Sequence, residues 1–170
     1  MAKPFKVKKL SPTDPIEYAA VRILKSRLRE FYSHWPVPGE IPTAESLHDM
    51  RISGKRLRYS AEMLRELYED KLALLIELMK RSQDLLGDYQ DCVTQRQLLD
   101  LEINRISRRN PSSQEIPVLH SIIEMYASRE HMLLGQFQDI WRGMSRDKFL
   151  NSIRAMILDT GQEKITKQTE

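Results

Sequence analysis

The chain has 170 residues, of which 41% are hydrophobic and 30% charged, and this balance is typical of one folded domain with a hydrophobic core. The composition excludes a disordered chain, and no apolar run reaches the ~18 residues that a membrane-spanning helix needs. The formal net charge of +3 is too small to require a polyanionic partner, so such a partner would have to be recognised by local clusters of charge.

The first two predicted elements follow an N-terminal arm, residues 1–11, which is basic and expected to be flexible. A Ser-Pro-Thr-Asp-Pro cluster then precedes a helix predicted over 15–34, and a proline- and glycine-rich break ends it. The second helix is predicted over 44–68, with Thr43 as its N-cap.

Two more long helices are predicted over 71–107 and 114–143, separated by the loop 108–113. A shorter helix over 145–158 and a polar tail, residues 159–170, complete the chain. Sustained period-two alternation is absent from the sequence, so we expect an all-α fold. Four long helices with short connections predict an antiparallel helical bundle with an added short C-terminal helix, in one domain over residues 12–158.

The sequence offers little for catalysis or metal binding. The single cysteine, Cys92, excludes an internal disulfide framework and is typical of a reducing compartment. No signal-peptide-like apolar stretch follows the basic N-terminus, so a cytoplasmic location is expected. His120 and His131 are too far apart in sequence to share a metal, and HExxH, paired CxxC, Walker and GxGxxG motifs are absent. We therefore expect no enzyme, no metal and no cofactor.

The most informative feature is a basic strip on the predicted second helix, formed by His48, Arg51, Lys55 and Arg58. At 100° per residue these side chains fall within an arc of roughly 80°. The apolar residues of the same helix fall on the opposite side; they are Met50, Leu57, Ala61 and Leu64.

Positions three or four apart on a helix are neighbours, so the basic strip would present a line of donors to phosphate oxygens. Such closely spaced cations repel one another unless something neutralises them, and Glu62 can neutralise only one. The alternative is a surface helix whose arginines pair with acids on neighbouring helices, and the residues alone leave both interpretations open.

A second basic row, Arg22, Lys25 and Arg29, lies at helical spacing on the predicted first helix. It could border a cleft shared with the basic strip, although an exposed, solvated face explains it as well. On the third helix, Lys80 and Gln83 share a face by the same spacing.

Two segments of the chain resemble the CHAD family, the conserved-histidine α-helical domain. These are HDMRISGKRLRYSAEML, from His48 to Leu64, and LMKRSQDLLGDYQDC, from Leu78 to Cys92; with the flanking helices the resemblance covers residues 12–158. It implies an all-helical accessory module that binds inorganic polyphosphate, or phosphate and sulfate ions, through a basic surface. The positions matched to the motif are His48, Arg51, Lys55, Arg56, Arg58, Lys80 and Gln83.

The chain departs from the family pattern in two ways. A typical CHAD domain has two pseudo-repeated halves, and this chain resembles the second half alone. Either it forms a homodimer that rebuilds a two-sided basic channel, or one wall is missing. Ser82 also stands where the family usually has leucine.

Three other functions remain open. A basic helix and a basic arm suit nucleic acid, although few aromatic residues interleave the cations and no base-reading set is evident, so this partner is less favoured. A hydrolase holding magnesium on Asp88 and Asp91 has thin support from two acids on one helix. A structural scaffold would bury the basic strip against a protein partner.

Overall fold

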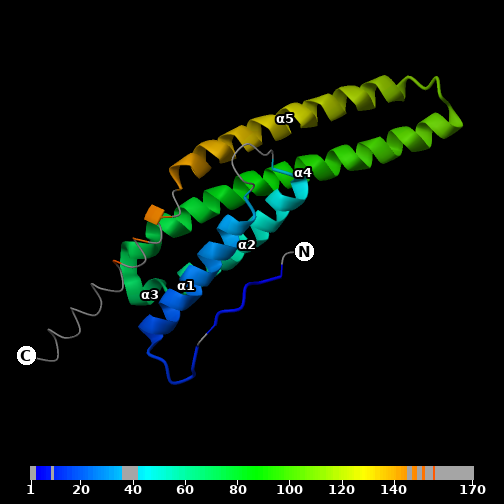
Figure 1. The fold of residues 1–170 in the computed structure, drawn as a ribbon. Coiled ribbons are helices and arrows are strands. Elements are labelled where there is room, and N and C mark those ends of the chain that lie inside the picture. Colours follow the sequence, from blue (N-terminus) through cyan, green and yellow to red (C-terminus); the bar gives the residue numbers. More distant parts are fainter. Residues whose placement is uncertain are drawn as a thin grey trace, which may run out of the picture. The chain divides into compact units, whose positions relative to one another are not determined.

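The computed structural model describes residues 3–8, 10–35, 42–144, 147, 148, 151 and 155. Its elements, shown in Figure 1, are α1 (Ile16–Ser33), α2 (Ala44–Met63), α3 (Arg65–Tyr68), the 3₁₀ turn η1 (Glu69–Leu72), α4 (Ala73–Arg109) and α5 (Glu115–Gly143). The predicted all-α class is confirmed, because every element in these ranges is helical. The predicted break over 36–39, the tail and most of the predicted helix over 145–158 lie outside the described residues.

The chain divides into two compact units. The first contains the described parts of Met1–Gln83 and Ile140–Glu170, and the second is Asp84–Asp139. Helix α4 contributes residues to both units, its first part to the former and the remainder to the latter.

Local signals in the sequence predict some helix ends correctly and others incorrectly. Thr43 is the N-cap of α2 as predicted, because its Oγ1 accepts a hydrogen bond from the Ser46 amide at 3.1 Å. Helix α1 begins after Pro15, which provides no side-chain cap. The predicted second helix is broken at Leu64, so that Arg65–Tyr68 forms a separate turn of helix, and η1 delays the start of α4 to Ala73.

The first unit is built on the antiparallel packing of α1 and α2 (Figure 1). The Tyr68 hydroxyl donates to the Glu17 carbonyl at 3.3 Å, which places the end of α3 beside the start of α1. The core contains the whole predicted apolar face of α2, with contributions from α1 and from the first part of α4. Its buried side chains include Leu24, Leu28, Phe31, Met50, Leu57, Ala61, Leu64, Leu75 and Met79.

Gly54 allows a close approach inside this core. A Cβ built at Gly54 would lie 3.3 Å from Cε2 of Phe31 and 4.0 Å from Cγ of Gln83. The Phe31 ring in turn belongs to an aromatic cluster with Tyr32 and Trp141, whose centroids lie 5.6 Å away in each case. The chain after α5 is fastened to α1, since the Tyr32 hydroxyl donates to the Met144 carbonyl at 2.8 Å.

The second unit is a helical hairpin, residues 84–139, in which α4 and α5 run antiparallel (Figure 1). Arg96 on α4 donates to both carboxylate oxygens of Glu130 on α5, at 3.0 and 3.1 Å. The buried apolar side chains of this unit are Leu86, Cys92, Ile103, Leu133 and Phe137. Leu98 on α4 is apolar but has 54% of its surface exposed.

Candidate anion-binding surfaces

The N-terminal arm lies along α1 through main-chain hydrogen bonds. The Phe5 amide donates to Oε2 of Glu30 at 3.1 Å, and Nη1 of Arg27 donates to the Phe5 carbonyl at 3.0 Å. Further along, Nη1 of Arg22 donates to the Lys8 carbonyl at 3.3 Å. The arm that the sequence predicts to be flexible therefore has defined partners over residues 5–8; its motion in solution stays a prediction.

Glu30 anchors both the arm and α2. Its carboxylate is fully buried and is ion-paired with Nη1 of Arg27 at 2.8 Å and with Nη1 of Arg56 from α2. A buried carboxylate requires such compensation, because an unpaired charge in the interior is costly. Arg56, matched to the family motif, thus directs its guanidinium to an internal acid.

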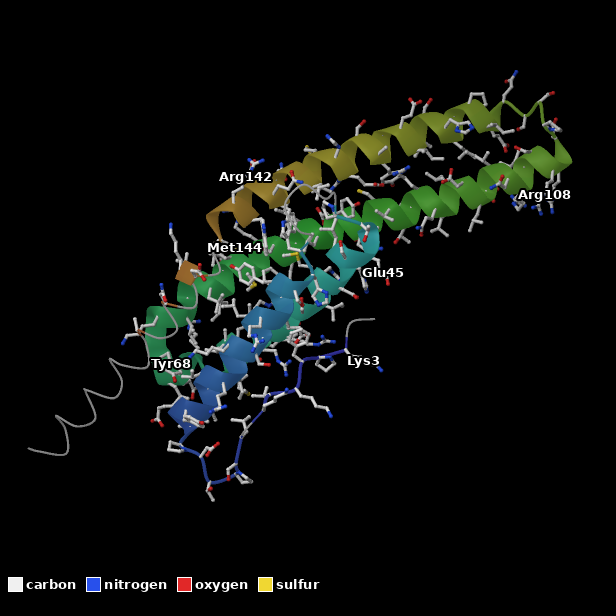
Figure 2. All side chains as sticks on the ribbon, viewed as in Figure 1. Lys3, Glu45, Tyr68, Arg108, Arg142 and Met144 are labelled. Carbon is white, nitrogen blue, oxygen red and sulfur yellow. The ribbon has the colours of Figure 1, made fainter. Side chains whose placement is uncertain are left out.

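A groove of about 460 Å³ separates the arm from α1. Its lining residues are Phe5, Lys6, Val7, Lys8, Arg22, Lys25, Ser26 and Arg29. Five of them are cationic and none is acidic. Figure 2 shows the described part of the arm, from the labelled Lys3 onward, following the first helix.

The second basic row forms the helical wall of this groove. Arg22 is fixed in place by the Tyr18 hydroxyl and by the Tyr18 ring, whose centroid lies 4.4 Å from the guanidinium carbon. Among the described residues, no acidic side chain is ion-paired with Lys25 or Arg29. Lys6 and Lys8 also line the groove, and no pattern in the sequence predicted that they would join this row.

The basic strip on α2 has three members with no acidic partner among the residues that the structure describes: His48, Arg51 and Lys55. All three are half-buried. Arg58 differs, because its Nε lies 3.6 Å from Oε1 of Glu62, and its guanidinium carbon lies 4.8 Å from the centre of the Tyr59 ring. Glu62 therefore neutralises one cation of the strip, as the sequence predicts.

Buried donors that make no hydrogen bond accompany this strip. The Nε atoms of Arg51 and Arg58 are buried and have no hydrogen-bond partner among the described residues, although Nε of Arg58 is within ion-pair distance of Glu62. Nε2 of the buried Gln83 is likewise unpartnered, and its side chain approaches α2 at Gly54. Lys80, on the same helix as Gln83, is exposed. A buried donor without an acceptor is costly, so these atoms favour a ligand or water that accepts hydrogen bonds.

The two basic surfaces have different walls. The groove is lined by the arm and α1 alone, so within the described chain it does not bring Arg22, Lys25 and Arg29 together with the basic strip. The α1–α2 boundary holds instead the ion-paired set of Glu30 with Arg27 and Arg56. The groove is therefore not the single cleft, shared by the basic strip and the second basic row, that the sequence left possible.

Other chemistry finds little support in the described residues. They contain no group of three histidine, cysteine or acidic side chains arranged to hold a metal ion. Asp88, considered above as a magnesium ligand, lies 3.5 Å from Nη2 of Arg129. Among the same residues, no helix combines the length and apolarity that crossing a membrane requires.

Comparison with known proteins supports the family resemblance. The family model for the CHAD domain matches residues 2–100, a segment that contains the arm, α1, α2 and most of α4. The match begins at residue 2, whereas the resemblance covers residues 12–158, and it ends at residue 100, before α5. No curated protein and no solved structure matches the chain. Because the matched segment is more than half of the chain and includes both quoted motifs, the protein belongs to the CHAD domain family.

Proposed function

We propose that this protein binds inorganic polyphosphate, or another phosphate-rich anion, without catalysing its turnover. The observation that carries the proposal is the groove between the arm and α1, whose described lining residues include five cations and no acid. The basic strip on α2 is proposed as a second contact surface for the same class of ligand. Membership of the CHAD family supports this ligand class.

The chemistry of the two surfaces suits a linear polyanion. Arginine offers a planar fork of donors to phosphate oxygens, and lysine offers a compact charge. The unpaired cations on each surface repel one another, and a chain of phosphates would remove that repulsion at several positions at once. A flexible polyanion can reach both surfaces, whereas a single phosphate ion would occupy one of them.

The proposed roles follow from the contacts of each residue. Arg51, Lys55 and Arg58 would pair with phosphate oxygens, while His48 and Gln83 would donate hydrogen bonds. In the groove, phosphate oxygens would be bound by Arg22, Lys25 and Arg29, together with Lys6 and Lys8. Lys80, which lies on α4, would extend the basic strip of α2. Arg56 would act mainly through Glu30, by holding α2 and the arm in register.

The test is polyphosphate binding measured by isothermal titration calorimetry at low salt. The triple variant Arg51→Ala, Lys55→Ala, Arg58→Ala is expected to lose most of the affinity, and the double variant Lys25→Ala, Arg29→Ala to lose part of it. Far-UV circular dichroism should show unchanged helical content in both. The matched control is Arg105→Ala, Arg108→Ala, Arg109→Ala, which removes three cations from the hairpin and should leave affinity within about twofold.

Equal loss in the control and in the triple variant would show that only net charge matters and would overturn the assignment of the two surfaces. Competition with DNA of matched charge separates polyphosphate from nucleic acid as the preferred ligand. Release of phosphate from polyphosphate in the presence of magnesium would contradict a purely binding role.

A further inference from the structure

The exposed face of α5 carries a regular alternation of large and small residues. Val118, Met125 and Met132 recur every seven positions and have 59%, 59% and 54% of their surface exposed. The small residues Ser121, Ser128 and Gly135 each follow one of them by three positions. We call these six residues the seam. Spacings of three and four within a repeat of seven are typical of a face that packs against another helix.

Val118, at one end of the seam, lines a pocket of about 400 Å³ with Glu102 and Ile106 of α4, whereas Met125 and Met132 are exposed. The buried apolar side chains of α5 are Leu133 and Phe137, which the helical period places on a different face from the seam. A Cβ built at Gly135 would meet no atom within 4 Å, in contrast to Gly54, where Phe31 is in close contact. A glycine in a helix costs about 1 kcal/mol relative to alanine, and no contact with the described residues accounts for Gly135.

The pattern is complementary to itself in one orientation. If two α5 helices cross antiparallel with their midpoints near residues 126 and 127, Met125 faces Ser128 of the second copy. The same register places Val118 opposite Gly135 and Met132 opposite Ser121. Each pair of facing positions, here called a layer, then combines one large and one small residue. In a parallel pair each serine would face the same serine of the second copy, which would leave unfilled space.

Polar side chains beside the seam agree with this register. Glu124 and His131 precede Met125 and Met132, so they share one flank of the seam, and both are exposed. In an antiparallel pair this flank faces itself, and Glu124 lies next to His131 of the second copy, twice by symmetry. On the opposite flank, the charge of Arg129 is offset within its own chain by Asp88, at 3.5 Å.

We propose that the seam on α5 is a homodimer interface in which two copies of this chain pair antiparallel about a two-fold axis. The inference does not depend on the proposed ligand, since it rests only on the hairpin, and α5 lies outside the segment matched to the family. A two-helix hairpin buries few side chains, and a second hairpin would convert it into a four-helix arrangement with a larger core.

The first test measures the mass of the full chain in solution, without polyphosphate, by sedimentation equilibrium. The wild type is expected to have twice the chain mass of 20.0 kDa. Met125→Glu is expected to give the single-chain mass with unchanged helical content. The matched control is Leu98→Glu on α4, which introduces the same charge at a similarly exposed apolar residue away from the seam and should stay dimeric.

The second test determines orientation by disulfide cross-linking. A mixture of Met125→Cys and Ser128→Cys chains is expected to cross-link rapidly, while either chain alone is not. The native Cys92 is buried and should not compete. Efficient cross-linking of Met125→Cys with itself would overturn the antiparallel register.

A third test asks whether the two residues of one layer face each other. Met125→Ser should leave a gap and Ser128→Met should create a clash, and each is expected to weaken dimerisation at least tenfold. The double variant restores one large and one small residue per layer, so its dimer affinity should return to within about threefold of the wild type. A monomeric wild type at all concentrations, dissociation by Leu98→Glu alone, or a double variant as weak as its parents combined would each refute the proposal.

Discussion

The carboxylate of Glu30 on α1 is fully buried and ion-paired with Arg56 on α2, across a sequence separation of 26 residues. The same carboxylate accepts the Phe5 amide and pairs with Arg27. One side chain therefore fastens two helices and the arm. Because the groove lies between the arm and α1, the shape of the candidate anion site depends on this buried acid.

Replacing Glu30 tests that dependence. Glu30→Ala should lower the free energy of unfolding by roughly 2 kcal/mol or more. Removing one partner of a fully buried ion pair costs about 3–5 kcal/mol. The expected loss is smaller here because the guanidinium groups of both arginine partners are partly exposed to solvent. Urea unfolding followed by circular dichroism measures the change. Glu66→Ala, which removes an exposed acid from α3, is the control and should have little effect. Equal stability of the two variants would contradict the anchoring role.

The contribution of the arm to binding can be read from salt dependence. Lys6→Ala with Lys8→Ala keeps the main-chain bonds of the arm but removes two cations from the groove. The slope of log affinity for polyphosphate against log salt should fall by roughly 1 per cation removed, as for other polyanions. Binding isotherms at several salt concentrations give the slope. Lys3→Ala, outside the groove lining, should leave it nearly unchanged, and a similar decrease there would exclude a specific groove.

Gly54 should resist substitution despite its helical position. Alanine normally stabilises a helix interior by about 1 kcal/mol relative to glycine. At Gly54 the added Cβ would lie 3.3 Å from the Phe31 ring, which is held by Tyr32 and Trp141 and has little room to move. We therefore expect Gly54→Ala to lower the unfolding midpoint in urea and Gly54→Val to lower it further. Gly143→Ala, where a Cβ meets nothing within 4 Å, should cause no loss.

Cys92 should react slowly with thiol reagents in the folded protein. Burial raises the pKa of its thiol above the ordinary value of 9.0, and the carboxylates of Glu130, Asp88 and Asp91 raise it further, while Arg129 opposes them. The reactive thiolate is therefore scarcer at pH 8 than in the unfolded chain, and the reaction rate should rise only at more alkaline pH. Rates with a chromogenic disulfide, measured across pH with and without urea, check this. Equal rates in both conditions would show that the thiol is accessible and unperturbed.

Local sequence patterns determined the helices and the faces they bury. Met50, Leu57, Ala61 and Leu64 follow the helical period, and all four are buried in the structure. The same period separates the basic strip from the core, because side-chain direction along one helix depends only on spacing. Thr43 could be assigned as an N-cap for a similarly local reason.

Contacts between segments that are distant in sequence could not be assigned in this way. Periodicity shows which way Arg56 points along its own helix, but not that the buried Glu30 lies within reach. Lys6 and Lys8 belong to a segment without periodicity, and only the main-chain bonds of the arm to Glu30, Arg27 and Arg22 bring them to the second basic row. The sequence by itself determined the helices and their charged faces. The tertiary structure decided which cations are neutralised internally and which line a common groove, because that depends on the packing of α1 against α2 and the arm.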